Sequence, residues 1–240
     1  AATAFLLAFP GHLRTLFLVT LLPGLATLAV IWRFVRDAPG RAEARAALPA
    51  DALTPPQAVL LAAVALWALG ASSEQFLLLR AGDLGVQPEF VPLVWLGVSL
   101  AKSAAAIIAG RFSDHRHPAV VLAAGWVLFA AAYAGLAASG SLATTLPLLA
   151  AVGMAYGVAE PAERALVAAL APAGGQGSAF GWYALVQGLM ALPAGLLAGW
   201  LWSRGPHGAG LAFAATAALA AAACVVLAAS ARVTGSRTAG

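Results

Sequence analysis

The stretch Gly110-Arg111-Phe112-Ser113-Asp114-His115-Arg116-His117-Pro118 is a short polar segment between two long apolar runs. It combines glycine, proline, arginine, histidine and aspartate in a chain of which only 9% of the residues are charged. Glycine, proline and charge concentrated in this way mark a turn. Because the flanking runs are almost free of charge, we expect this turn to lie at a membrane surface with an apolar helix on either side.

The composition places most of the chain in lipid. Of its 240 residues, 62% are hydrophobic, and the mean hydropathy is +0.90. A soluble domain of this composition would expose an apolar, adhesive surface. The single cysteine, Cys224, excludes an internal disulfide and a thiolate metal cluster. The composition therefore predicts an all-α, polytopic membrane protein.

Seven apolar runs are long enough to cross about 30 Å of hydrocarbon at about 1.5 Å of helix rise per residue. Backbone polar groups cannot stay unpaired in lipid, so each run is predicted to be a helix. The predicted spans are Leu13–Phe34, Ala58–Leu79, Phe90–Ala109, Ala119–Ala138, Leu142–Leu170, Ser178–Trp202 and Gly208–Ser230. The apolar residues 1–9 are too few to span and are predicted to be the tail of another helix.

The distribution of arginine predicts the orientation. Proline and arginine gather after the first span, which marks a loop outside the lipid. If that loop is cytoplasmic, eight of the 13 basic residues lie on the cytoplasmic side, as the positive-inside rule favours. These eight are Arg33, Arg36, Arg41, Arg45, Arg111, Arg116, Arg232 and Arg237. The polar turn at residues 110–118 is then cytoplasmic as well.

The polar turn resembles the signature loop of the major facilitator superfamily, a class of secondary transporters, written roughly G-x-L-[SA]-D-R-x-G-R-R. Gly110, Ser113 and Asp114 match the pattern in place, and Phe112 stands where the pattern has leucine. The rest of the pattern is lost, since His115 occupies the arginine position after the aspartate. A degraded copy of the loop is usual in the second half of such transporters, so the resemblance indicates the C-terminal half.

The resemblance implies an architecture. The seven spans resemble helices six to twelve of a twelve-helix transporter, which is a six-helix C-terminal half plus the preceding helix. Residues 1–34 are then the tail of one helix and the last helix of the N-terminal bundle, and residues 35–57 are the basic cytoplasmic linker. Residues 58–230 are the six-helix bundle, and residues 231–240 are a cytoplasmic tail. The implied partners are the lipid bilayer and the missing N-terminal half of the same transporter.

Ionisable and amide side chains within the spans are the candidates for the transport path, because each costs about 2.5–3.5 kcal/mol at the centre of a helix in lipid. The expected path residues are Glu74, Gln75, Lys102, Glu160 and Gln187. They fall on the spans that line the central cavity or border the other half in the superfamily. Lys102 is expected to be a counter-charge for an anionic substrate or for a carboxylate such as Glu160, or else part of a structural ion pair. Glu74 is expected to be a protonatable carboxylate or a polar residue near the outer vestibule.

A second group of residues is expected to gate the path. Glu163 and Arg164 are predicted to form a structural or gating pair, and the spacing of Glu160 and Arg164 also suits an ion pair along one helix face. In the signature loop the expected gating residues are Gly110, Ser113, Asp114 and Arg116. The resemblance implies that Asp114 holds the cytoplasmic side shut near the start of the span at Ser178, and that Gly110 lets helices approach closely.

Glycine spacing predicts close helix packing at two places. Gly153 and Gly157 are four residues apart in the fifth span, and Gly195 and Gly199 form a G-x-x-x-G pair in the sixth. The sixth span also carries Gly181 and Gly188 at seven-residue spacing, which keeps them near one face.

No enzyme or metal chemistry is expected from this sequence. The four histidines have no partners at metal-ligand spacing, and no catalytic or phosphate-binding motif is found. We therefore expect no metal, no cofactor and no nucleic-acid partner. The predicted function is secondary transport of a small organic solute across a cell membrane (inner or plasma), with proton-coupled efflux favoured because few polar residues face the cavity. The alternatives are proton-coupled uptake and a transporter-derived membrane sensor or scaffold.

Overall fold

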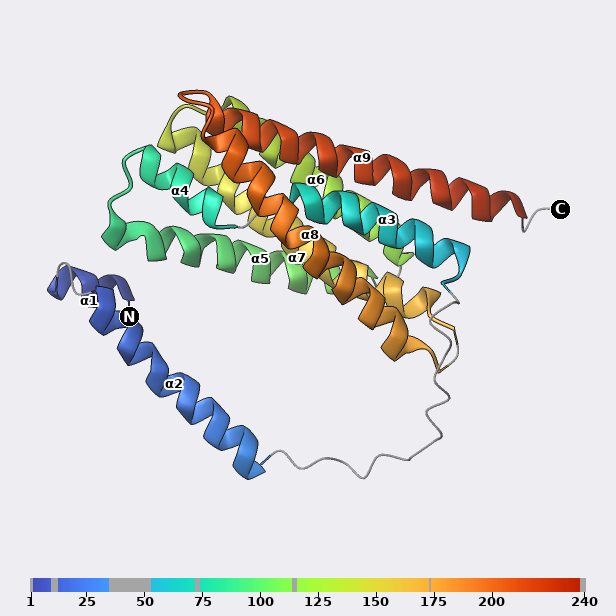
Figure 1. Cartoon of the computed structure of the whole chain (residues 1–240), viewed down its shortest axis with the longest axis horizontal. Coiled ribbons are helices and arrows are strands. Elements are labelled where there is room, and N and C mark those ends of the chain that lie inside the picture. The colour runs from blue at the N-terminus through green and yellow to red at the C-terminus, as the bar shows by residue number, and fades with distance from the viewer. Residues whose placement is uncertain are drawn as a thin grey trace.

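The computed structural model describes residues 2–9, 13–34, 53–71, 74–113, 116–172 and 174–237, and the regular structure in these ranges is helical (Figure 1). Six helical segments are long and apolar enough to cross a membrane, and they pack as a bundle. These segments are Pro55–Asp83, Pro88–Arg111, Pro118–Ala138, Leu142–Leu170, Gln176–Trp202 and Gly208–Ala229. The chain therefore has the architecture of a multi-pass, all-α membrane protein.

The helices follow the predicted spans closely. The bundle consists of α3 (Pro55–Gly70), α4 (Gln75–Asp83), the 3-10 turn η1 (Pro88–Phe90), α5 (Val91–Ser113), α6 (Pro118–Ala138), α7 (Leu142–Leu170), α8 (Gln176–Trp202) and α9 (Gly208–Arg237). Two helices precede it, α1 (Ala2–Ala8) and α2 (Leu13–Phe34). The bounds of α7 and α2 are those predicted from the sequence.

The first bundle span was predicted as one helix over Ala58–Leu79, and this is wrong. Helix α3 ends at Gly70 and α4 starts at Gln75. At the break, the Thr216 hydroxyl of α9 donates to the Gly70 carbonyl at 2.8 Å, which satisfies a carbonyl at the end of a helix. A side chain at Gly70 would come within 2.8 Å of Leu219 Cβ. The end of α3 is therefore held against α9 by a contact between residues far apart in the sequence.

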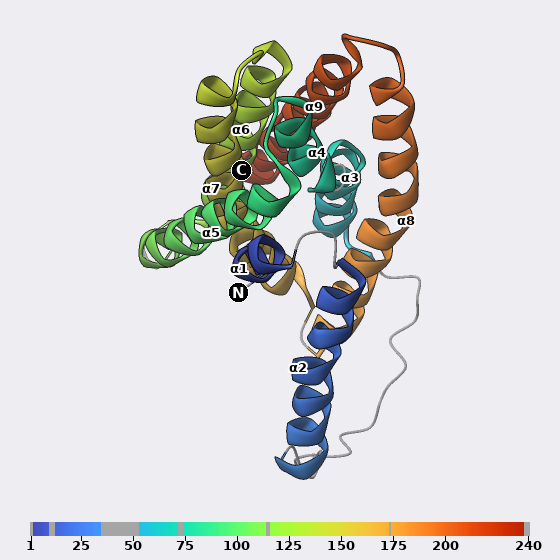
Figure 2. The same cartoon turned by 90° about the vertical axis from the view of Figure 1, so that its left-hand side faces the viewer.

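Neighbouring helices are arranged in a pattern that occurs twice (Figures 1 and 2). Helix α3 packs on α9 as α7 packs on α6, and α5 packs on α7 as α8 packs on α3. Helices α6 and α9 pack on each other. Exchanging α3, α5 and α6 for α7, α8 and α9 therefore keeps the same neighbours. Since each set has three spans, the two sets cross the bundle in opposite directions, as in an inverted repeat.

The centre of the bundle is aromatic. Trp67 of α3 stacks on Trp126 of α6 with ring centroids 6.0 Å apart, and it meets Tyr156 of α7 edge-on at 5.7 Å. Phe129 and Tyr133 of α6 extend the cluster, and all five side chains are buried. Aromatic contacts of this kind add to the energy of burial. They hold α3, α6 and α7 in fixed positions around the polar groups described below.

The remaining parts of the predicted domain organisation are only partly visible. The described side chains of α2 are exposed, and its apolar stretch Leu21–Phe34 is shorter than a full span, so the seventh span stays a prediction. Residues 35–52 of the predicted linker lie outside the described residues, and α3 already begins at Pro55, where Thr54 and Gln57 form a capping box. The predicted tail at 231–240 is helical as far as Arg237.

Candidate functional site

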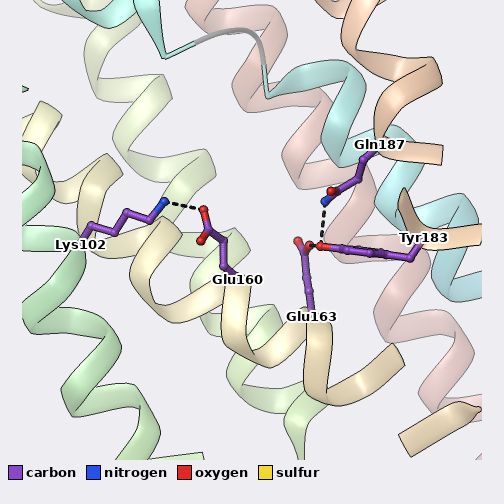
Figure 3. A network of polar contacts seen from close by, with 5 residues as sticks. All are labelled: Lys102, Glu160, Glu163, Tyr183 and Gln187. Atoms are coloured by element: carbon purple, nitrogen blue, oxygen red, sulfur yellow. Dashed lines mark hydrogen bonds and ion pairs between the residues drawn. The ribbon is translucent and has the colours of Figure 1, made fainter. Parts of the chain in front are cut away.

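Helix α7 carries the polar groups of the bundle interior. Ser141 caps its first turn by accepting a hydrogen bond from the Thr144 amide at 3.3 Å. The helix then continues for 29 residues and includes Pro147 and Pro161. It packs on α5, α6 and α8, so side chains on different faces of α7 meet different helices. Figure 3 shows the two polar clusters that result.

The glycines of α7 bring α5 close to it. A Cβ atom at Gly153 would lie 2.5 Å from the carbonyl oxygen of Val98, and one at Gly157 would overlap the carbonyl oxygen of Lys102. Only glycine permits such a backbone approach. The packing predicted for Gly153 and Gly157 is thus confirmed. As a consequence, the backbone of Lys102 lies against Gly157 of α7, about one helix turn before Glu160.

The first cluster is an ion pair between α5 and α7. Lys102 Nζ lies 2.5 Å from Glu160 Oε1 (Figure 3), and the two side chains are 34% and 36% exposed. The ammonium also lies over the ring of Tyr156, 5.3 Å from its centroid, which is within the range of a cation–π contact. Of the two partners expected for Lys102, the structure contains the Glu160 carboxylate. The pair is partly open, so a charged solute could compete for either member.

The second cluster surrounds Glu163, whose side chain is only 1% exposed. Trp126 Nε1 of α6 donates to Glu163 Oε1 at 3.0 Å, and the Tyr183 hydroxyl of α8 donates to Glu163 Oε2 at 2.7 Å. Gln187 Nε2 donates to the Tyr183 oxygen at 2.8 Å (Figure 3). Glu163 therefore connects its own helix, α7, to α6 and to α8 through neutral donors.

The predicted pairing of Arg164 is wrong. Among the described residues the salt bridge is the one between Lys102 and Glu160, and Arg164 is exposed. Consecutive residues of a helix point about 100° apart, so Glu163 faces the interior while Arg164 faces outward. Glu160 is already held by Lys102, and the (i, i+4) pair of Glu160 with Arg164 does not form.

Glu74 and Gln75 lie at the break between α3 and α4. Glu74 is the residue before α4, it is partly buried, and its carboxylate interacts electrostatically with Lys102 and Glu160. Gln75 is exposed at the first position of the helix. The break in the span thus places Glu74 near the ion pair, so three of the five predicted path residues lie in one region and Gln187 lies in the other cluster.

The signature loop is only partly described. Gly110 is exposed in the last turns of α5, and a Cβ atom there would meet none of the described residues within 4 Å, so the close approach expected at Gly110 stays a prediction. Ser113 ends α5, and Arg116 is exposed before α6. Asp114 lies outside the described residues, and its predicted role stays a prediction.

Sequence reasoning missed the two donors to Glu163. Trp126 belongs to a span without charged side chains, so nothing local marked it as polar. Tyr183 had a signal, because it stands four residues before Gln187 and therefore on the same helix face. Polar aromatic side chains can be partners of a buried carboxylate, and a search limited to ionisable and amide groups overlooks them.

The fold and site together define the class of protein as a helical, multi-pass membrane protein with charged groups inside the bundle. Comparison of the chain with family models, with curated proteins and with solved structures found no match. The resemblance of residues 110–114 to a transporter signature therefore rests on those residues alone.

Proposed function

We propose that this chain is the C-terminal part of a secondary transporter of the major facilitator type, which moves a small organic solute across a cell membrane. The observation that carries the proposal is the ion pair of Lys102 and Glu160, partly exposed within a bundle of six apolar helices. Charges in such a place are costly, and they mark substrate or ion pathways in membrane proteins.

The repeated packing of the helices supports the same function. Many secondary transporters are built from inverted repeats, with the substrate site near the middle of the membrane. Here, exchanging α3, α5 and α6 for α7, α8 and α9 keeps the same helix neighbours. The polar clusters lie on α7, the counterpart of α3. The broken span of α3 and α4 also fits, because discontinuous helices often border the sites of transporters.

Helices α5 and α8 would border a second half of the transporter. They are counterparts in the repeat, and they are the least buried of the six candidate spans. In such an architecture, alternating access moves one half against the other around a fixed site. Proton-coupled efflux is the form of transport that we favour, since the polar side chains of the interior are few and include three carboxylates, Glu74, Glu160 and Glu163.

The test is a transport assay with the full-length gene product in proteoliposomes. A panel of cationic, zwitterionic and anionic organic solutes is applied with an imposed pH gradient, and proton movement is followed with a pH-sensitive dye. We expect solute-dependent proton flux that is abolished by Lys102→Ala and kept by the matched change Ser103→Ala one residue away. Counterflow without proton movement would exclude proton coupling. Binding without any flux would show a sensor or scaffold instead of a transporter.

A further inference from the structure

We infer that Glu163 is a proton-binding group that controls the contact between α7 and α8. The sequence suggested a gating pair with Arg164, but the structure gives Glu163 a different environment. Its side chain is almost completely buried, and both carboxylate oxygens are held by neutral donors. A buried carboxylate without a paired cation is costly in its charged form, and protonation to the neutral form removes that cost.

The charged groups around Glu163 leave it without a paired cation. On its own helix, Glu160 and Arg164 act on it electrostatically with opposite sign, and Tyr156 is a further titratable group that interacts with it. Glu160 is bound to Lys102, and Arg164 points outward. Helix α3 has no ionisable side chain. The titratable groups brought to this region by the other neighbours are Lys102 from α5, Tyr133 from α6, Tyr183 from α8 and Glu74 beside α4.

The two donors respond differently to a proton. The Trp126 indole N–H can only donate, and Oε1 still accepts from it when Oε2 is protonated. The Tyr183 hydroxyl now donates to Oε2 and accepts from Gln187. When one proton from water adds to Oε2, two hydrogens face each other, and the Tyr183 hydrogen must turn away. Tyr183 then accepts from both neighbours, and its own hydrogen has lost its acceptor.

The bond between α6 and α7 therefore keeps its direction on protonation, whereas the bond between α7 and α8 reverses and leaves the Tyr183 hydrogen without the carboxylate as its acceptor. A buried donor left without an acceptor is unfavourable. Helix α8 otherwise packs mainly on α3 and α9. The hydrogen bond through Tyr183 is therefore the contact through which a proton can change the position of α8 relative to α7. This assignment supplies a coupling group for the proposed transport function and rests on that function for its use, but it can be tested without any flux.

The first measurement is infrared difference spectroscopy of the whole chain in liposomes, between alkaline and acidic buffer. We expect the C=O band of a protonated carboxylic acid to appear on acidification. Glu163→Gln should remove the contribution of one carboxyl, and the matched change Glu160→Gln should keep it. If Glu163→Gln leaves the band unchanged, another carboxyl takes the proton and the inference is wrong.

The second measurement is the distance between spin labels on α7 and α8. The labels are placed through Met154→Cys and Leu189→Cys, two exposed positions, in a Cys224→Ala background. We expect the distance to increase on acidification, and Glu163→Gln to show the acid-like distance at every pH. An unchanged distance in all variants would overturn the control of the helix contact.

Tyr183→Phe keeps the inference testable if Glu163→Gln does not insert. It keeps the carboxyl but removes the switching hydroxyl, so the acid C=O band should persist while the label distance stays long at both pH values. If the distance in Tyr183→Phe still changes with pH as in the unmodified chain, the contact is not controlled through this hydroxyl.

Discussion

Helices α7 and α8 are both long and apolar, and each carries a pair of glycines four residues apart, yet the two helices use their glycines differently. Gly153 and Gly157 of α7 lie against the backbone of α5. On α8, a Cβ atom at Gly181, Gly188, Gly195 or Gly199 would meet nothing within 4 Å among the described residues, so the close packing predicted at these positions is not found in the described part of the chain. The same spacing therefore marks a packed face on one helix and an open face on the other.

The physical reason for the difference lies outside each helix. A glycine allows another backbone to come close, but it does not attract one, and the gain comes from the contacts that form. Helix α7 has α5 and α6 on two faces, and Gly125 of α6 would place a Cβ atom 3.0 Å from the backbone of Ala159. Helix α8 packs mainly on α3 and α9 and less on α7, and Cβ atoms at its glycines would meet none of the described residues within 4 Å. An open glycine face leaves α8 less firmly held than α7.

The largest expected effect is that of Gly157→Ala. The new methyl group would overlap the Lys102 carbonyl, and two helix backbones must separate to admit it. We expect a loss of about 3 kcal/mol of stability, at the upper end of overpacking effects, measured by SDS titration with circular dichroism. The matched control is Gly188→Ala on α8, which should lose nothing. Equal losses for the two variants would contradict the proposed difference between the helices.

The next effect tests the polar link between the two helices. Tyr183→Phe removes a donor from the buried Glu163 carboxylate, so we expect a loss of about 2 kcal/mol, as for a hydrogen bond to a charged group. Tyr133→Phe is the matched control, because the buried Tyr133 hydroxyl has no hydrogen-bond partner among the described residues. This control should be neutral or stabilising in the same SDS titration. Similar losses for both changes would mean that ring packing, and not the hydroxyl, is responsible.

A smaller effect is expected for the ion pair between α5 and α7. Lys102 and Glu160 are each about one third exposed, so we expect a coupling energy of about 1 kcal/mol, at the upper end for accessible pairs. The measurement is a double-mutant cycle of Lys102→Met and Glu160→Gln. A coupling energy near zero would show that the pair does not stabilise the contact of α5 with α7.

The smallest effect on stability is expected for a glycine on the open face of α8. Gly195→Ala adds a methyl group to open space and removes the entropic cost of glycine in a helix, so we expect a gain of about 0.5–1 kcal/mol. We expect this variant to keep its fold. If α8 moves during transport, the distance between the labels on α7 and α8 should still change on acidification. A loss of stability would show that another surface covers this face in the membrane.

Much of the fold could be predicted because lipid simplifies the problem. A run such as Leu142–Leu170 has no partner for its backbone groups except itself, so it must be a helix of those bounds. Prediction was wrong at Gly70, where the helix ends and its carbonyl accepts a hydrogen bond from Thr216 of α9. Glu160 was one of the two partners expected for Lys102. Glu163 was assigned the wrong partner, Arg164.

Composition and periodicity alone are sufficient for the all-α class, the candidate spans and the short set of polar residues within them, since each follows from the cost of polar groups in lipid. Packing in three dimensions was needed to decide which glycines are covered, where the first bundle span breaks and which side chains hold Glu163. Trp126 and Tyr183 are 57 residues apart in the sequence yet meet at one carboxylate. Such contacts depend on how whole helices cross, and no local pattern encodes the angle at which they do so.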